Sequence, residues 1–181
     1  TRLYTAAAAV TPIHHTMKPM VWAVPNTTEL LAEVQAIPNT ILMSDLEERT
    51  GEGNITGLNG LLLGLARRKD IDGICLLGEM PTYIAELTTP YPKASKAILE
   101  VLAKILTIEV DLTSLDGMAD DVESNMERIY NMIPPEVRER IDRFKQAKSL
   151  KGKGVGPITE GDKRRIMQGI EEYFGKGSKE D

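Results

Sequence analysis

The carboxylate of Glu79 stands where chemistry would be expected. It follows an apolar run ending at Gly78, which predicts a buried strand with a carboxylate at its far end. In open α/β sheets, ligands and partners gather at the ends of such strands, so our candidate pocket consists of Glu79, Pro81, Tyr83 and Gly57. General acid–base catalysis needs a tuned partner within hydrogen-bond reach, and the sequence places none near Glu79. We therefore favour a carboxylate that caps backbone N–H groups, and we predict no catalytic residue.

Two adjacent histidines, His14 and His15, invite a metal-binding interpretation. Ligands must converge on one ion, but neighbouring side chains on a strand or helix point to different sides. The chain contains no other histidine, and the pattern offers no third ligand nearby. We expect both rings to lie in a solvated loop, and we predict no metal and no cofactor.

Glycines at 51, 53 and 57 precede a predicted helix and could present backbone N–H groups to an anion. As a phosphate-binding signature the run is weak, because it lacks the lysine and hydroxyl of a P-loop and does not follow directly on a strand. Gly57, Gly60 and Gly64 also recur at spacings of three and four along one helix side. We favour the interpretation that they let this helix approach a sheet closely.

The single cysteine, Cys75, lies within an apolar run and excludes a disulfide within the chain. Reactive cysteines need an electropositive, partly exposed setting, so we expect an inert and buried thiol. Neither a Ser-His-Asp nor a Cys-His constellation can be assembled from the sequence.

The composition is that of a globular protein, since 41% of the 181 residues are hydrophobic and 27% are charged. The net charge of −5, without a dense basic stretch, argues against binding to nucleic acid. There is no run of about 18 apolar residues and no charged-then-apolar leader, so we expect a cytoplasmic protein without membrane contact. The chain opens at Thr1 almost inside an apolar stretch, and we expect that an N-terminal portion is missing.

Strands and helices alternate over residues 1–106. Apolar runs predict strands, and apolar residues at i, i+3, i+4 and i+7 predict helices. The helix over 57–68 is apolar nearly all round, which predicts that it is buried. Strands separated by helices indicate an α/β fold with a mainly parallel sheet and helices on both faces. We expect strands at 3–10, 20–24, 40–43 and 71–77, a loop at 44–56, and helices from residue 26 to before Pro38, at 57–68 and at 92–106.

A heptad-like seam of apolar residues follows Asp111 and predicts a long acidic helix. Pro134 and Pro135 break this helix, and the same spacing continues on a second one. Such a stripe must be buried against the core, against itself or against another subunit. The seam consists of Leu115, Ala119, Val122, Met126, Ile129 and Ile133, followed by Val137, Ile141 and Phe144.

We therefore divide the chain into an α/β core at 1–110, a helical hairpin appendage at 111–150 and a C-terminal part at 151–181. The last part begins with a flexible basic linker at 151–157, continues with an amphipathic helix at 159–174 and ends in a disordered polar tail. Apolar residues of the two helical parts are our candidates for partner binding. They are Val122, Met126, Ile129, Ile170, Tyr173 and Phe174.

Three ordered blocks carry a family resemblance: residues 57–66 (GLNGLLLGLA), 73–83 (GICLLGEMPTY) and 91–102 (YPKASKAILEVL). They resemble the second half of the archaeal and bacterial proteasome assembly chaperone family, and residues 108–115 (IEVDLTSL) resemble its turn into C-terminal helices. The similarity covers residues 1–133. It implies a three-layer α/β fold akin to nucleoside phosphorylases, assembly into a homo-oligomer and, in archaea, binding to proteasome α-subunits.

The chain departs from that family at both ends. The family's N-terminal strands and early glycine-rich turn have no counterpart here. Chaperones that dock on the α-ring commonly end in hydrophobic-Tyr-any, whereas this chain ends in KED at 179–181. Residues 170–174 have suitable residue types, but neither that spacing nor a terminal carboxylate. Some members carry a ligase label, which the glycine run does not support because it lacks basic phosphate ligands.

Three functions compete, and we rank them in this order. The first is a non-enzymatic assembly chaperone or scaffold that binds proteasome-type subunits through its C-terminal helices, as the seam and the tethered terminal helix favour. The second is a small-molecule enzyme or ligase that acts on a nucleoside or nucleotide at the Glu79 strand edge. The third is a purely structural homo-oligomer whose appendage builds rings.

Overall fold

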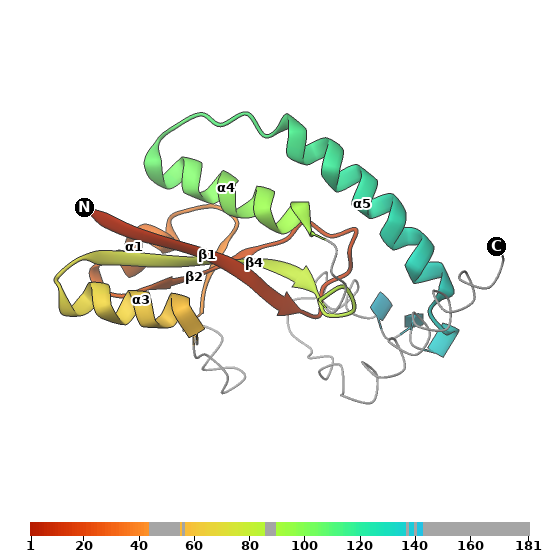
Figure 1. The fold of residues 1–181 in the computed structure, drawn as a ribbon, viewed down its shortest axis with the longest axis horizontal. Helices are drawn as coiled ribbons and strands as arrows, with labels where there is room; N and C mark the ends of the chain where they lie inside the picture. The colour runs from red at the N-terminus through yellow and green to blue at the C-terminus, as the bar shows by residue number, and fades with distance from the viewer. Residues whose placement is uncertain (44–54, 56, 86–89, 137, 140, 143–181) are drawn as a thin grey trace, which may run out of the picture. The chain divides into compact units, whose positions relative to one another are not determined.

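The computed structural model describes residues 1–43, 55, 57–85, 90–136, 138–139 and 141–142, drawn as a coloured ribbon in Figure 1. In this part of the chain four strands form one sheet in the order β1-β4-β2-β3. The bounds of α3 and α4 confirm the helices predicted at 57–68 and 92–106. The strands are β1 (Arg2–Thr11), β2 (Val21–Pro25), β3 (Thr40–Leu42) and β4 (Asp72–Pro81), and the helices are α1 (Glu29–Gln35), α3 (Gly57–Arg68), α4 (Pro92–Leu106) and α5 (Thr113–Met132).

The sheet is mixed, which corrects the expectation of a mainly parallel one. β2 runs parallel to β3 but antiparallel to β4, so that Val21 lies opposite Gly78 and Pro25 opposite Ile74. The arrowheads of β1 and β4 point the same way in Figure 1. Alternation of strands and helices predicts crossover connections, but it does not fix the direction in which the chain re-enters the sheet. The connection that contains α3 returns the chain in the direction opposite to β2.

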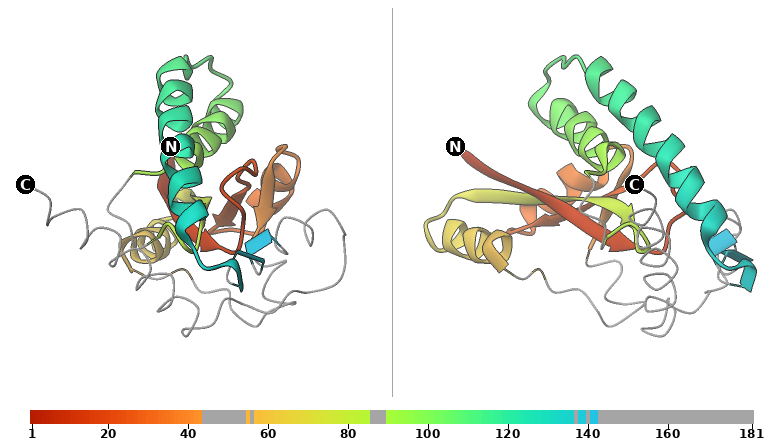
Figure 2. Two further views of the ribbon diagram at one scale, coloured as in Figure 1. Left: turned by 90° about the vertical axis from the view of Figure 1, so that its right-hand side faces the viewer. Right: turned by 45° about the vertical axis from the view of Figure 1, so that its right-hand side comes forward.

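Helices cover both faces of the sheet, as predicted: α1 and α4 lie on one face and α3 on the other (Figures 1 and 2). Side chains along β4 alternate between these faces, so Ile74 and Leu76 pack towards α1 and α4, whereas Cys75 and Leu77 pack towards α3. Cys75 is fully buried, as predicted, and this burial raises the pKa of its thiol. The first core also contains Val21, Ala23, Leu30, Val34, Leu42, Ala97, Ile98 and Val101.

Gly78 lets α4 approach β4 closely. A Cβ atom at this position would lie 2.6 Å from the carbonyl oxygen of Ala94 and 3.0 Å from its Cβ. The first distance is shorter than Cβ atoms tolerate and the second is tight, so a side chain here would force the backbone of Ala94 to move.

Helix α3 is not buried all round, and that prediction is wrong. Leu63 and Ala66 face the sheet and are buried, but Leu58, Leu61 and Leu65 are 68%, 60% and 48% exposed. A helix that packs on one sheet face buries a single stripe. Its apolar far side therefore cannot be read as evidence of burial.

The glycines of α3 do not let it approach the sheet, which corrects the second interpretation of these residues. Open space surrounds the Cβ positions of Gly57 and Gly64. A Cβ at Gly60 would lie 2.5 Å from the carbonyl oxygen of Ile55, in the segment just before the helix. The close approach at Gly60 is thus local, and Gly57 has a φ of +69°, which favours glycine at the start of the helix.

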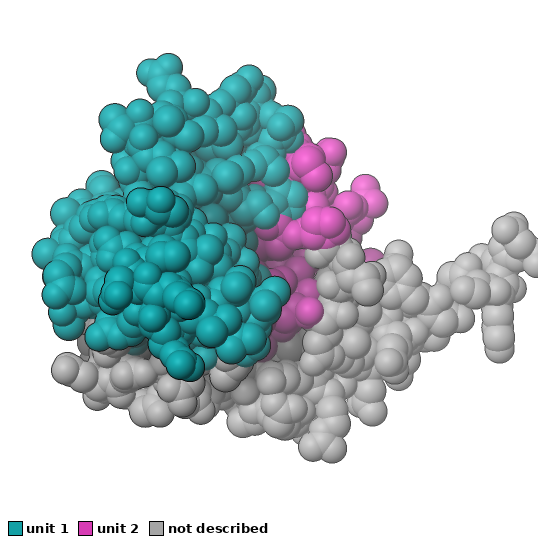
Figure 3. Space-filling model, turned by 60° about the vertical axis from the view of Figure 1, so that its left-hand side comes forward, with its two compact units in different colours: residues 1–9, 19–79, 92–116 teal, residues 10–18, 80–91, 117–181 magenta. Residues whose placement is uncertain are grey.

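Contacts divide the chain into two compact units, coloured separately in Figure 3. Unit 1 comprises residues 1–9, 19–79 and 92–116, and it holds most of the sheet with α1, α3 and α4. Unit 2 comprises residues 10–18, 80–91 and 117 onwards, including most of α5. Each unit is considered by itself below.

The heptad-like seam predicted after Asp111 forms one side of α5. Ala119 and Met126 on the helix, and Ile133 just after it, are buried within this chain, whereas Val122 and Ile129 are half-buried. Within the described residues, no helix is long and apolar enough to cross a membrane. The predicted basic linker and the helix at 159–174 lie outside the described residues.

Candidate functional site

Glu79 lies inside β4, because the strand continues to Pro81 and does not end at Leu77 as predicted. Its side chain is buried, and both carboxylate oxygens accept hydrogen bonds in unit 1. The backbone N–H of Met20 donates to Oε2 at 2.9 Å, and the indole N–H of Trp22 donates to Oε1 at 3.2 Å. The bond from Met20, just before β2, is of the kind that the capping interpretation predicts, whereas the second donor is the side chain of Trp22.

The four residues of the candidate pocket are divided between the units. Gly57 and Glu79 belong to unit 1, whereas Pro81 and Tyr83 belong to unit 2. The structure therefore defines no common pocket for them, and the pocket stays a prediction. A cavity of about 320 Å³ in unit 1 is lined by other residues, at the start of α1 and in the turn from α3 to β4.

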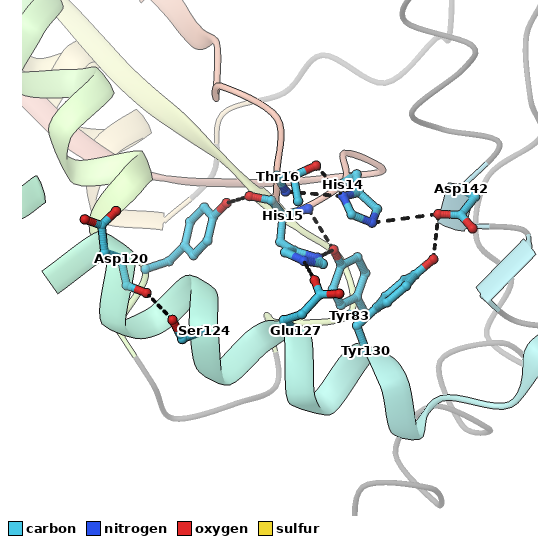
Figure 4. Close-up of polar contacts among 10 residues, drawn as sticks. His14, His15, Thr16, Tyr83, Asp120, Ser124, Glu127, Tyr130 and Asp142 are labelled. Carbon is cyan, nitrogen blue, oxygen red and sulfur yellow. Dashed lines mark hydrogen bonds and ion pairs between the residues drawn. The ribbon is translucent and has the colours of Figure 1, made fainter. Parts of the chain in front are cut away.

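Unit 2 instead contains a cluster in which two buried histidines contact the buried Tyr83 and the partly buried Tyr130, and we call it the histidine cluster (Figure 4). His14 and His15 are only 4% and 1% exposed, so the expectation of a solvated loop is wrong. Their ring centroids lie 4.2 Å apart, and Tyr130 of α5 contacts both rings. The cluster comprises His14, His15, Thr16, Tyr83, Glu127, Tyr130 and Asp142.

The hydrogen bonds of His15 fix its tautomer. The backbone N–H of His15 donates to the hydroxyl oxygen of Tyr83 at 2.8 Å, and that oxygen lies 2.7 Å from Nδ1 of the same histidine. The proton of the Tyr83 hydroxyl can therefore point to Nδ1, which accepts it. The ring proton of neutral His15 is then on Nε2, which donates to Oε2 of Glu127 at 3.1 Å.

The hydrogen bonds of His14 give it the same tautomer. The backbone N–H of Thr16 donates to Nδ1 of His14 at 3.2 Å, which leaves the ring proton on Nε2. That nitrogen faces Asp142, with Oδ1 at 3.8 Å. The hydroxyl of Tyr130 donates to the same Asp142 oxygen at 2.5 Å.

The tyrosines of the histidine cluster are hydrogen-bond donors and not nucleophiles. Burial is the main cause that raises the pKa of Tyr83. Burial is also the largest cause of the raised pKa of Tyr130, and the hydrogen bond to Asp142 raises that pKa further. Both hydroxyls are therefore neutral at physiological pH. Since Tyr83 is only 5% exposed, a substrate cannot reach its oxygen.

The histidine cluster has a structural role, because its hydrogen bonds connect separate segments of unit 2. Its buried groups bond to one another, whereas Thr16 and the carboxylates of Glu127 and Asp142 are exposed, the carboxylate side chains to 55% and 52%. Among the described residues, no group of three or more His, Cys, Asp or Glu is arranged to hold a metal ion. The cluster joins the loop after β1 and the turn after β4 to α5, and so fixes α5 within unit 2.

Sequence reasoning missed this site because the partners are far apart in the chain. Tyr83 is 68 residues from His15, and Glu127 is 112 residues from it. The one local signal is that Tyr130 lies four residues after Met126 and three after Glu127, so it neighbours both the buried seam and a carboxylate on α5.

The predicted partner-binding residues divide into three groups. Met126 is only 2% exposed and so belongs to the interior, whereas Val122 and Ile129 are half-buried and remain accessible at the edge of the seam. Ile170, Tyr173 and Phe174 lie outside the described residues.

Comparisons with known proteins match this chain to a family model, to an uncharacterized relative and to solved structures. A model of the PAC2 family matches residues 1–130. An uncharacterized protein of Methanocaldococcus jannaschii is 39% identical over 85 residues, which are 47% of this chain and 31% of that protein. The crystal structure of Pyrococcus furiosus PbaB, described as an archaeal proteasome activator, is 28% identical with a TM-score of 0.57, and the match covers 71% of this chain and 50% of PbaB.

Two further crystal structures share the fold. Pyrococcus furiosus PbaA, described as an archaeal homolog of proteasome-assembly chaperone, is 23% identical with a TM-score of 0.53 over 81% of this chain and 54% of PbaA. A Mycobacterium tuberculosis protein of unknown function is 20% identical with a TM-score of 0.60 over 92% of this chain and 52% of that protein. The chain thus matches about half the length of these solved structures.

Proposed function

Since this chain belongs to the PAC2 family, we propose that it acts as a non-enzymatic assembly chaperone that binds subunits of a proteasome-type complex. The observation that carries this proposal is the 28% identity to PbaB over 71% of the chain, because PbaB is described as a proteasome activator. The fold shared with PbaA, a homolog of proteasome-assembly chaperone, agrees with it.

We assign partner binding to α5 and the C-terminal residues that follow it. The histidine cluster holds α5 in one orientation, which lowers the entropic cost of presenting its outer side to a partner. Met118 and Met132 on that side are 50% and 42% exposed, and methionine adapts well to varied surfaces. Val122 and Ile129 border them, and Ile170, Tyr173 and Phe174 complete the proposed contact set.

The finer features of the proposal follow from the family resemblance. We propose proteasome α-subunits as the partners, a homo-oligomer as the working state and the archaeal cytoplasm as the compartment. A nucleoside-phosphorylase-like arrangement of the core, and the division at residues 110 and 150, belong to the same proposal.

The enzyme hypothesis gains no support from Glu79. Both of its oxygens accept hydrogen bonds within this chain, from the backbone N–H of Met20 and the indole N–H of Trp22. A general acid or base needs an oxygen directed at a substrate.

The proposal is tested by capturing purified proteasome α-subunits on the immobilised chain. We expect the α-subunits to be retained at micromolar concentration, and Met118→Glu to reduce retention. The matched control is Leu61→Glu on α3, which alters a leucine of similar exposure and leaves α5 unchanged. No retention, or equal retention by both variants and the wild type, would contradict the proposed role of α5.

A further inference from the structure

A groove of about 550 Å³ in unit 1 runs beside the C-terminal end of α4 and the segment that follows it. Glu100, Ala103 and Lys104 of α4 form one wall, and residues 107–110 with Leu112 form the other. Ile108 and Val110 in this second wall are 52% and 42% exposed. An apolar surface of this kind, rimmed by charged groups, is typical of an interaction site.

Residues 108–112, with the sequence IEVDL, have the pattern of a strand without being part of one. Apolar and acidic residues alternate, as in a strand with one buried face. In the described structure these residues belong to no helix or strand, and they form the connection from α4 to α5 seen in Figure 1. A sequence that favours pairing therefore lies exposed next to an apolar groove.

Both ends of this segment are fixed. The backbone N–H groups of Thr107 and Ile108 donate to the carbonyl oxygens of Lys104 and Ala103, at 3.3 and 3.0 Å. Thr107 has a φ of +53°, which turns the chain sharply out of α4. At the other end, Asp111 accepts the backbone N–H of Thr113 at 3.0 Å and its hydroxyl at 2.6 Å. The segment is thus pre-organised, so residues 108–112 lose less conformational entropy when a partner pairs with them.

We propose that residues 108–112 and the adjoining groove bind an extended, basic segment of a partner protein, which forms a two-stranded pair with residues 108–112. Main-chain hydrogen bonds supply affinity in such an addition, and pockets for alternate side chains supply specificity. Apolar side chains of the partner enter the groove beside Ile108 and Val110. Its cationic side chains face Glu100 and Glu109, which outnumber Lys104 in the groove, and Asp111 of the segment itself.

The charge of the segment argues against pairing with a second copy of itself. Two antiparallel copies of residues 108–112 would place Glu109 and Asp111 of one chain opposite the same carboxylates of the other. Like charges directly opposite one another destabilise a strand pair. The proposal goes beyond the assembly function above, because it names a site and a partner chemistry that do not depend on the partner being a proteasome subunit.

The test uses a fluorescent probe peptide in which lysine and valine alternate, and its binding to the full chain is measured by anisotropy. We expect saturable binding that Ile108→Ser with Val110→Ser weakens by about tenfold or more, equivalent to about 1.4 kcal/mol. Glu109→Lys should weaken it similarly, and added salt should weaken it further. A peptide with glutamate in place of lysine should not bind.

Two controls keep the result interpretable. Leu61→Ser removes an exposed leucine from α3 and should leave the affinity unchanged. Thermal unfolding of each variant shows whether it is folded. Glu109 is exposed, so Glu109→Lys should leave the stability of the fold unchanged.

Three outcomes would overturn the proposal. They are an absence of saturable binding, equal affinity of the wild type and the Ile108→Ser, Val110→Ser variant, and equal binding of the acidic peptide. A wild-type dimer that this double substitution dissociates would assign the segment to a second copy instead. None of these results bears on whether α5 binds α-subunits, so the two proposals fail separately.

Discussion

At the residue scale, the histidine cluster depends on hydrogen bonds that no local sequence pattern predicts. His14 and His15 are adjacent, and adjacency alone suggested a solvated pair. Their burial follows from Tyr83, Glu127 and Tyr130, whose positions are set by the tertiary fold. A buried polar group without a partner costs stability, so these rings are buried only because the distant partners are present.

The first prediction concerns the hydroxyl of Tyr83. Tyr83→Phe removes the hydroxyl that bonds to the backbone N–H and Nδ1 of His15, which is only 1% exposed. We expect the free energy of unfolding to fall by about 1–3 kcal/mol, measured by urea denaturation.

Tyr130→Phe is the matched control for that prediction. It removes a hydroxyl bonded to Asp142, whose side chain is 52% exposed, so water can replace the lost bond. The expected loss is below about 1 kcal/mol. Equal losses for the two variants would show that burial of the Tyr83 hydrogen bonds is not what makes them matter.

At the element scale, the sequence predicts the bounds of helices better than it predicts the direction of a strand or the buried side of a helix. The bounds of α3 and α4 follow from apolar spacing, and Pro92 marks the start of α4. The direction of β4 depends on where the chain crosses the sheet, and the burial of α3 depends on what lies beyond its outer side. Neither of these is encoded in a local pattern, so the mixed sheet and the exposed leucines of α3 were not foreseen.

The second prediction concerns the contact between α4 and β4. Gly78→Ala places a Cβ atom 2.6 Å from the Ala94 carbonyl oxygen, which forces α4 to move. We expect a loss of about 1–3 kcal/mol in the free energy of unfolding, measured by chemical denaturation.

Gly64→Ala makes the same chemical change in open space within α3. Because alanine is the better helix former, this variant should gain up to about 1 kcal/mol. If Gly78→Ala were neutral or stabilising, the close packing of α4 on β4 would be refuted.

The third prediction concerns the start of α5. The hydroxyl and backbone N–H of Thr113 donate to Asp111 and hold the pKa of that carboxyl below its usual range. A carboxyl with a lowered pKa contributes stability above its unfolded value of about 3.9, and this stability is lost as the pH falls through the folded value. Asp111→Ala should therefore reduce the urea midpoint near neutral pH, and the difference from the wild type should vanish in acid.

Asp121→Ala, which removes an exposed carboxylate in the middle of α5, controls for the loss of one charge. It should leave the urea midpoint near neutral pH little changed. A deficit of Asp111→Ala that persists unchanged in acid would exclude the hydrogen bonds from Thr113 as its cause.

At the scale of the whole molecule, the α/β class and the family were predictable from three blocks of sequence, whereas the mixed sheet and the site were not. The blocks at 57–66, 73–83 and 91–102 have fixed order and spacing, so they identify the family without any tertiary information. The predicted parts at 1–110, 111–150 and 151–181 stay a prediction. Partner binding depends on surfaces, and exposure at residues such as Met118 and Ile108 becomes visible only when the chain is folded.

Binding to protein partners, the function we propose for this chain, can be measured by sedimentation velocity of the chain mixed with purified proteasome α-subunits. We expect a new, faster-sedimenting species at micromolar concentration that contains both proteins, and we expect Met118→Glu to reduce its amount. Sedimentation of the two proteins as independent species across that concentration range would contradict it.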